Sequence, residues 1–522
     1  MNFLNTLLLF TLFLFLSKNF RRIGENIFSH NFFLKSNKLI IFLISFNIVL
    51  LIGFSGKYLF SNFYLDHVEP QIATVSWFFE YKKDIYNSTS DYERYSLIFG
   101  PITYYTNYLM MKIFGASILT SKIISYLFIN LTLVLTFLNS YKITKKIGFS
   151  FFLTGLMAMI FLSTVAAVLR ISNDSLVFFL ISLSVYFCLS NYSLKKIFLF
   201  SIIFIFILNI KPNLILGVLP STYYIFIRSP RKIRDIIIFF IIVLVSLYFI
   251  WSYQNLSYIN YFHWIQIISE FEYMNGFAFD IFLKNLSFSL LWIVPLAILY
   301  KLDWKKIKTY ERNFFIILFF SSLTLSFIGS RKGAGTAELF SLIPPALFLF
   351  CKSYKRGTYY ISKKIFGFNY CYTIILICIF FHSSTKGLYK KIEFLNKHNY
   401  SNQIIELKKI LSDFPDKKIN MGYGSNYKSY VISYLRPILT FDRNNFVLDV
   451  PHLIETIDKI PINLTFLENC NDEIYVFVKN DKHFFSKYWN KTIFNETFIN
   501  KFYENFKKIK QYNFFEIWNC NK

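Results

Sequence analysis

Acidic residues are scarce in this chain. Only 30 Asp and Glu stand against 56 Lys and Arg in 522 residues, so the formal net charge is +26. Such an excess suits a nucleic-acid partner only where it forms a basic face on a water-exposed fold. Here the Lys and Arg residues sit in short connections between apolar runs. The sequence therefore predicts no nucleic-acid partner.

Cysteine spacing of the metal-binding kind is also absent. None of the six cysteines belongs to a CxxC or Cys/His pattern, which argues against a structural zinc site. Only Cys470 and Cys520 lie in a polar part of the chain, its C-terminal tail. A disulfide between them is a hypothesis that the sequence leaves open, because it requires an oxidising compartment and a suitable geometry.

Apolar residues make up 55% of the chain, and the mean hydropathy is +0.42. Apolar runs near the length of a membrane span recur along it, which predicts an all-α polytopic membrane bundle of about twelve transmembrane helices. The first run has no cleavage site and is read as an uncleaved span, with an interfacial helix as the alternative. The predicted spans are 2–17, 39–57, 118–140, 147–168, 175–191, 197–209, 213–228, 235–251, 286–300, 313–330, 338–351 and 366–382.

Lys and Arg concentrate in alternate connections between these spans, and such connections face the cytoplasm. The opposite connections, together with everything after residue 382, are then extracytoplasmic. The predicted domains are a transmembrane domain, 1–382, and a soluble outer domain, 383–522. Helical patterns alternate with strand-like runs in the outer domain, which favours a small α/β layer with a cover or substrate-docking role. The expected helices are 402–414, 451–460 and 497–508, and the expected strands are KINMGYG, PILTF, EIYVFVK and NFFEIWNC.

The first outer loop, 58–117, is net negative, whereas most other short connections are strongly positive. We expect two juxtamembrane helices in it, in 68–81 and 97–114, since each stretch carries an apolar stripe but is too polar to be surrounded by lipid. Gly100 and Pro101 are expected to start the second helix, and Gly115 to end it as a C-terminal cap. A carboxylate just outside a bilayer is suited to act as a base or to hold a cation. The loop's acids are Asp66, Glu69, Glu80, Asp84, Asp91 and Glu93.

Cations occur on the same predicted face, which the charge bias of membrane proteins disfavours. Arg170 lies next to Asp174 in a short connection, and Lys211 separates two half-length apolar runs in a broken-helix pattern. Arg331 and Lys332 belong to a glycine-containing turn suited to an anion. These four cations are the candidate phosphate-binding residues.

Several motifs resemble those of the GT-C glycosyltransferases, which include protein O-mannosyltransferases and polyprenyl-phosphate-sugar-dependent aminoarabinose transferases. The carrying segments are DHVEPQIATVSWFFEYKKDIY and YSLIFGPITYYTNYLMMKIFG in the first outer loop, RISNDSL, NIKPNL and GSRKGAGTAELFSLIPPALFL. They run through the whole predicted membrane region in the family's order. The sequence departs from the family where many relatives have adjacent Asp and Glu, because here Val68 precedes Glu69.

The resemblance implies an inverting transfer of a sugar from a polyprenyl-phosphate donor to a lipid, glycan or protein acceptor. The site would lie at the extracytoplasmic face of a bacterial inner membrane. It assigns the catalytic base, or a carboxylate ligand of a divalent metal such as Mg or Mn, to Glu69 first and Asp66 second. Glu93 and Asp174 are candidates for contact with the acceptor or a cation, and the four cations would bind the donor phosphate.

Two other classes stay open. A flippase or transporter of lipid-linked sugars would also have broken helices, but it predicts paired charges in mid-span and an internal repeat, neither of which the sequence displays. A ligase for O-antigen or similar polymers would share the basic outer face, but it would not need the acidic first loop followed by Gly100 and Pro101.

Overall fold

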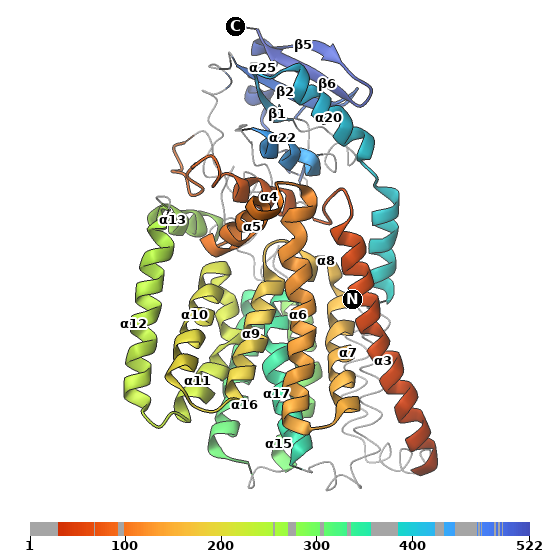
Figure 1. The fold of residues 1–522 in the computed structure, drawn as a ribbon. Helices are drawn as coiled ribbons and strands as arrows, with labels where there is room; N and C mark the ends of the chain where they lie inside the picture. The colour runs from red at the N-terminus through yellow and green to blue at the C-terminus, as the bar shows by residue number, and fades with distance from the viewer. Residues whose placement is uncertain are drawn as a thin grey trace.

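The computed structural model describes the chain in several stretches: 30–66, 68–91, 99–253, 256–269, 278–302, 307–330, 336–356, 385–422, 433–443, 467, 470, 472–484, 487–488, 491–492 and 494–521. Long helices run roughly side by side in one part of the molecule, and a small sheet with its helices sits at one end of them (Figure 1). We call this end of the bundle the domain end.

Each predicted span from 39–57 to 338–351 coincides with a helix, or with a short helix and its continuation. Predicted spans 2–17 and 366–382 lie outside the described residues. The bundle consists of α3 (His30–Leu59), α6 (Ile118–Thr144), α7 (Ile147–Ser163), α8 (Val165–Leu169), α9 (Asp174–Cys188), α10 (Leu194–Ile210), η1 (Pro212–Gly217), α11 (Leu219–Ile227), α12 (Lys232–Trp251), α15 (Phe279–Leu302), α16 (Thr309–Ile328), η3 (Thr336–Leu342) and α17 (Ile343–Lys355).

Four described helical stretches are long and apolar enough to cross a membrane by length and composition: Phe42–Leu59, Ile118–Thr144, Lys232–Trp251 and Thr309–Ile328. Helices α7 and α9 are shorter but also apolar. Exposed apolar side chains on α12, such as Leu244 and Phe249, suit a lipid-facing surface. These features support an integral membrane protein, while the count of about twelve spans stays a prediction.

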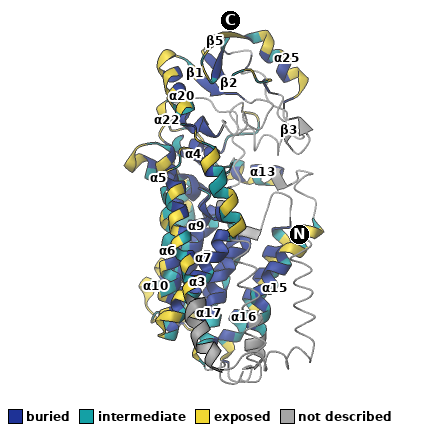
Figure 2. Ribbon diagram, turned by 90° about the vertical axis from the view of Figure 1, so that its right-hand side faces the viewer, coloured by how far each residue is buried: buried dark blue, intermediate teal, exposed yellow. Residues whose placement is uncertain are grey.

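Small residues allow close helix contacts inside the bundle. A Cβ at Gly155 of α7 would lie only 2.4 Å from the carbonyl oxygen of Ile44 in α3. Glycine therefore lets the two backbones approach, as small residues do between membrane helices. Figure 2 shows the dark blue of buried residues along α7 and α9 in the middle of the bundle.

Two short helices, α4 (Val68–Trp77) and α5 (Pro101–Phe114), lie across the domain end (Figure 1). They confirm a helix in each of the two stretches expected in the first outer loop, although α4 ends at Trp77 rather than at 81. Their position beside a membrane stays a prediction. Pro101 stands in the first turn of α5, where its missing N–H has no helical partner to lose. Gly115 ends the helix with a φ of 83°, a left-handed value that favours glycine.

The C-terminal domain contains a four-stranded sheet in the order β1–β2–β6–β5, in which β1 and β2 are parallel and the other pairs antiparallel. A two-stranded pair, β3 and β4, lies apart from it, and α13 belongs to the bundle side. The bounds are α13 (Tyr258–Ser269), α20 (Ser401–Asp413), β1 (Lys418–Met421), η5 (Ser433–Leu435), α22 (Arg436–Asp442), β2 (Glu473–Val478), β3 (Lys487–Tyr488), β4 (Lys491–Thr492), α25 (Glu496–Asn505), β5 (Phe506–Gln511) and β6 (Phe515–Cys520).

One predicted strand was wrong. The run PILTF, 437–441, belongs to helix α22, where Pro437 occupies the first turn. Its apolar residues face the bundle: the Phe441 ring lies 6.2 Å from Trp77 of α4, and the Tyr81 hydroxyl donates a 2.9 Å hydrogen bond to the Thr440 carbonyl. The composition of this run suits a strand as well as a helix, and contact with α4 favours the helix.

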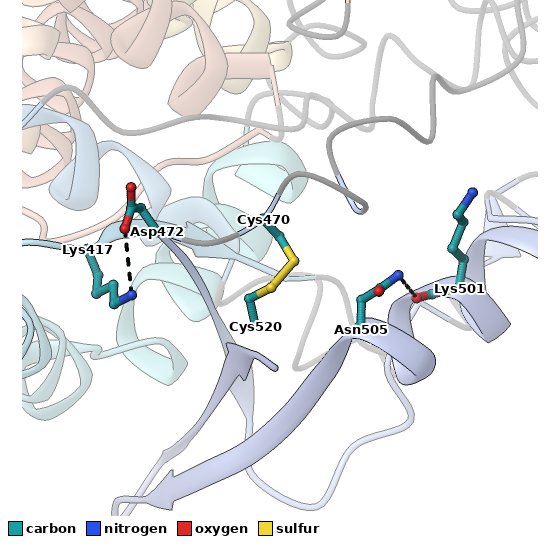
Figure 3. Close-up of a disulfide and its surroundings, with 6 residues drawn as sticks. All are labelled: Lys417, Cys470, Asp472, Lys501, Asn505 and Cys520. Carbon is teal, nitrogen blue, oxygen red and sulfur yellow. Dashed lines mark hydrogen bonds and ion pairs between the residues drawn. A yellow bond between two sulfur atoms is a disulfide. The ribbon is translucent and has the colours of Figure 1, made fainter. Parts of the chain in front are cut away.

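A disulfide joins Cys470 to Cys520 at the end of β6 (Figure 3). It closes a sequence separation of 50 residues that contains β2, α25, β5 and most of β6. Both cysteines are buried in a cluster of aromatic residues. The structure therefore has the bond that the sequence left open.

Candidate active site

The first predicted acid, Asp66, begins the turn into α4. Its Oδ1 accepts a 3.0 Å hydrogen bond from the Val68 backbone N–H, an Asx-type turn that orients the start of the helix. The Glu69 side chain reaches back from the first turn, and its Oε2 accepts hydrogen bonds from the backbone N–H groups of Leu65 (2.7 Å) and Asp66 (3.0 Å). The three-residue spacing of the two acids therefore builds a local turn.

Glu69 is fully buried, with 0% of its surface exposed. Its other carboxylate oxygen accepts a hydrogen bond from the Tyr58 hydroxyl at the end of α3. Burial, and then the charge of Asp66, raise the pKa of Glu69 to about 7, although the Tyr58 hydrogen bond and the Lys122 charge oppose this. Glu69 is thus enclosed by protein groups and is not open to a substrate.

Lys122 of α6 is a buried cation that the sequence analysis missed, because it lies inside an apolar run. Only 1% of its surface is exposed. Its ammonium donates to the carbonyls of Ser61 (2.8 Å), Phe63 (2.7 Å) and Tyr58 (3.2 Å), and it lies 4.4 Å from the centre of the Tyr58 ring. Lys122 thereby fastens residues 58–63, the segment that leads to Asp66, onto α6.

Asp66 forms an ion pair with Arg170, in which Nη2 lies 2.8 Å from Oδ2. Both side chains keep a partial exposure, 19% for Asp66 and 27% for Arg170. Burial lowers the pKa of Arg170, but Asp66, Asp174 and Glu69 together raise it above its ordinary value. Of the two predicted catalytic acids, Asp66 is the one at the surface of the site.

The connection 170–174, between α8 and α9, is anchored on α5. Asn173 adopts a left-handed φ of 62°, which asparagine tolerates better than most residues. Its side-chain amide donates to the Thr103 carbonyl (3.0 Å) and the Thr106 hydroxyl (2.6 Å). These bonds fix Arg170 and Asp174 relative to the first outer loop.

Lys211 lies between α10 and η1, where the helix breaks as the sequence predicted. Its ammonium is 3.4 Å from Asp174 and 3.4 Å from Glu338 of η3. Burial lowers the pKa of Lys211, but these two carboxylates outweigh it and the pKa is raised. The structure thus brings Asp66, Arg170, Asp174 and Lys211 into one chain of alternating charges, to which Glu338 adds an acid that the sequence analysis did not select.

The end of α10 is pressed against the start of α5. A Cβ at Gly100 would lie 2.0 Å from the carbonyl oxygen of Asn209, and the Gly100 N–H donates to the Ile210 carbonyl at 3.1 Å. Only glycine leaves room for this contact. The contact holds the backbone before Lys211 against the first outer loop.

Three predicted site residues, Glu93, Arg331 and Lys332, lie outside the described residues. Their roles stay predictions.

The carboxylates of Asp66 and Glu69 do not fit a divalent metal as they are arranged here. Three of their four oxygens accept hydrogen bonds from protein groups, and the fourth, Oδ2 of Asp66, forms the ion pair with Arg170. The residues near them include the cations Arg170 and Lys122, whereas Mg and Mn require several free oxygen ligands. Within the described stretches, no group of three or more His, Cys, Asp or Glu residues could hold a metal.

No family model matches the sequence, and no curated protein matches it. Two solved structures of ArnT from Cupriavidus metallidurans are similar, each at 11% identity. The apo structure has a TM-score of 0.50, with 90% of this chain and 97% of that chain covered. The structure bound to undecaprenyl phosphate has a TM-score of 0.48, with 92% and 97% covered. The chain has an ArnT-like fold, as the resemblance to GT-C enzymes implied.

Proposed function

We propose that this chain is an integral-membrane glycosyltransferase. It transfers a sugar from a polyprenyl-phosphate donor to an acceptor at the extracytoplasmic face. The observation that carries the proposal is the partly exposed Asp66, paired with Arg170 where the first outer loop meets the bundle. The ArnT-like fold and the order of the GT-C-like segments support the same class.

Asp66 is the proposed base, because it is partly exposed whereas Glu69 is enclosed. Its carboxylate takes the proton from an acceptor hydroxyl, whose oxygen attacks the anomeric carbon of the sugar. The bond from this carbon to the phosphate oxygen breaks, and the electron pair leaves with the polyprenyl phosphate. Attack on the face opposite the leaving group inverts the configuration. Glu69 is then a positioning residue that holds the backbone N–H of Asp66.

Cations beside the base suit the negative charge that develops on the leaving phosphate. Arg170 and Lys211 are the described members of this set. Arg331 and Lys332 are proposed to contribute on the strength of the sequence. The acceptor, which is a lipid, glycan or protein in the resemblance, contacts Asp174 or Glu93 in this proposal.

The distribution of buried charge favours a transferase over a flippase. In the described bundle helices, buried charged residues stand near helix ends, such as Asp235 and Glu311 in first turns and Lys122 in the second turn of α6. Passage of a polar sugar through the bundle would call for charged groups in mid-span. None stands there in the described helices.

The test is turnover by the purified full-length protein in liposomes supplied with a panel of polyprenyl-phosphate sugars and a membrane lipid extract. We expect release of polyprenyl phosphate together with a glycosylated acceptor. Movement of lipid-linked sugar between leaflets without release of polyprenyl phosphate would overturn the proposal in favour of a flippase.

The orientation is tested separately. A reporter that is active only outside the cytoplasm, fused after Lys386, should be active in a bacterial inner membrane. Activity of a cytoplasmic reporter at the same position would put the site on the wrong face for this function.

A further inference from the structure

The helix formed by residues 385–397 lies beside the domain end of α3, in cyan below α20 in Figure 1. Lys57 of α3 donates to Asn396 of this helix at 2.7 Å, and Asn62 donates to Ser401, at the start of α20 just beyond the helix, at 2.9 Å. This helix follows the predicted transmembrane domain and leads into α20 of the outer domain. It therefore joins the outer domain to the segment that carries Asp66.

One face of this helix points at the site. Gly387, Lys391, Phe394 and His398 are spaced by four, three and four residues, so they share a face. At one end of that face, a Cβ on Gly387 would lie 3.1 Å from the Leu162 carbonyl oxygen at the end of α7.

At the other end of the face, the rings of Phe394 and His398 lie 5.5 and 5.9 Å from the ring of Phe63. Lys391 stands between these two contacts. Its side chain consequently emerges between the end of α7 and the segment that precedes Asp66.

Lys391 interacts electrostatically with Asp66, Glu69 and Arg170, which places its ammonium in the neighbourhood of the proposed base. Burial lowers its pKa, although the two carboxylates oppose this. Its ammonium also lies 5.5 Å from the centre of the Phe394 ring. Within the described part of the chain, no hydrogen bond or ion pair occupies this ammonium.

The other described cations of the site are already engaged. Arg170 is paired with Asp66, Lys211 lies between Asp174 and Glu338, and Lys122 donates to backbone carbonyls. A half-buried cation without a counter-ion is costly unless an anion joins it. The position of Lys391 therefore matches a group whose partner arrives with the substrate.

We propose that Lys391 binds the phosphate of the polyprenyl-phosphate donor, so that the outer domain completes the donor site. The inference rests on the proposed function. It adds a phosphate-binding cation to Arg170 and Lys211, the described candidates, which are already paired with carboxylates. The phosphate oxygen adjoins the anomeric carbon that the acceptor attacks, so a phosphate-binding group must lie near the base. In the products, Lys391 would neutralise part of the charge on the departing phosphate.

The variants for the test are Lys391→Ala, Lys391→Gln, Lys391→Arg and the control Lys390→Ala. Lys390 is exposed and precedes Lys391 in the same helix, so its replacement removes the same charge at a neighbouring position. Gln keeps part of the aliphatic side chain and a polar end without the charge, so it provides a second test should Ala disturb folding. Thermal unfolding in detergent verifies that each full-length variant is folded.

The first readout is the Kd for undecaprenyl phosphate in nanodiscs, and the second is the KM for donor and acceptor in transfer. We expect Lys391→Ala and Lys391→Gln to raise the Kd and the donor KM about ten-fold or more. Lys391→Arg should stay within about three-fold of wild type because it keeps the charge. Lys390→Ala should match wild type.

Three outcomes would overturn the inference in different ways. An unchanged Kd with unchanged transfer in folded Lys391→Gln would remove Lys391 from the donor site and leave the proposed function intact. A raised acceptor KM with an unchanged Kd would assign the cation to an anionic acceptor group instead. If wild type neither binds undecaprenyl phosphate nor transfers sugar, the proposed function fails, and the inference fails with it.

Discussion

The Tyr58 hydroxyl donates a hydrogen bond to the buried Glu69 carboxylate, so the end of α3 is joined to the first turn of α4. This bond lies beneath the turn that presents Asp66. Two acids three residues apart thus have different surroundings, one enclosed by donors and one open to the site. In the proposed function, this difference is the reason for giving positioning to Glu69 and proton transfer to Asp66.

The pH dependence of stability tests the surroundings of Glu69. Its pKa of about 7, against an ordinary 4.5, means that the folded state favours the protonated form. This stabilisation is complete below about pH 4.5 and is lost as the pH rises through about 7, by an amount of about 3 kcal/mol. Glu69→Gln cannot titrate at this position. The unfolding midpoint of wild type in detergent should therefore fall relative to Glu69→Gln between pH 5 and 8. A difference that does not vary with pH would contradict the buried environment.

Removal of the Lys122 ammonium should loosen the first outer loop. Lys122→Met keeps the length of the side chain but leaves the carbonyls of Tyr58, Ser61 and Phe63 without their buried donor. We expect the free energy of unfolding to fall by about 3 kcal/mol or more, and proteolysis between residues 58 and 66 to become faster. The control is Lys112→Met, which removes an exposed ion pair with Glu80. Exposed pairs contribute about 1 kcal/mol or less. Equal unfolding midpoints for Lys122→Met and Lys112→Met would show that Lys122 does not stabilise the loop.

The disulfide should stabilise the outer domain without taking part in transfer. The chain-entropy account gives about 4 kcal/mol for closing a loop of this length. Peptide mapping under non-reducing conditions should recover Cys470 linked to Cys520. Replacement of both cysteines by Ser should lower the unfolding midpoint of the outer domain and leave the KM for the donor close to that of wild type. Two thiols that react with maleimide before any reduction, in protein from an oxidising compartment, would contradict the bond.

The sequence predicted the parts of the fold that local chemistry decides. Hydropathy located helices such as α12, and the Gly100–Pro101 pair located the start of α5. It failed at residues 437–441, because an apolar run of that length suits a strand as well as a helix and contact with α4 decides between them. Pro437, in the first turn of α22, was the available signal for a helix.

The sequence predicted which segments form the candidate site, but not the role of each residue in it. The sequence identified both Asp66 and Glu69 but could not predict which of them is buried, because the burial of Glu69 depends on Tyr58 of another helix. Lys122 looked like part of a membrane span. Lys391 looked like one of many lysines in a polar tail, and only the packing of residues 385–397 on the loop brings it to the base.

The central claim is that Asp66 is the base of a sugar transfer from polyprenyl phosphate. Asp66→Asn keeps the size of the side chain and the hydrogen bond to Val68, but it removes the charge that accepts the proton. The control is Asp84→Asn, an exposed acid of the same loop.

The decisive measurement is the rate of polyprenyl-phosphate release by wild type and both variants in liposomes. We predict a fall of about a hundred-fold or more for Asp66→Asn, and a rate within about two-fold of wild type for Asp84→Asn. A folded Asp66→Asn that releases polyprenyl phosphate as fast as wild type would contradict the account.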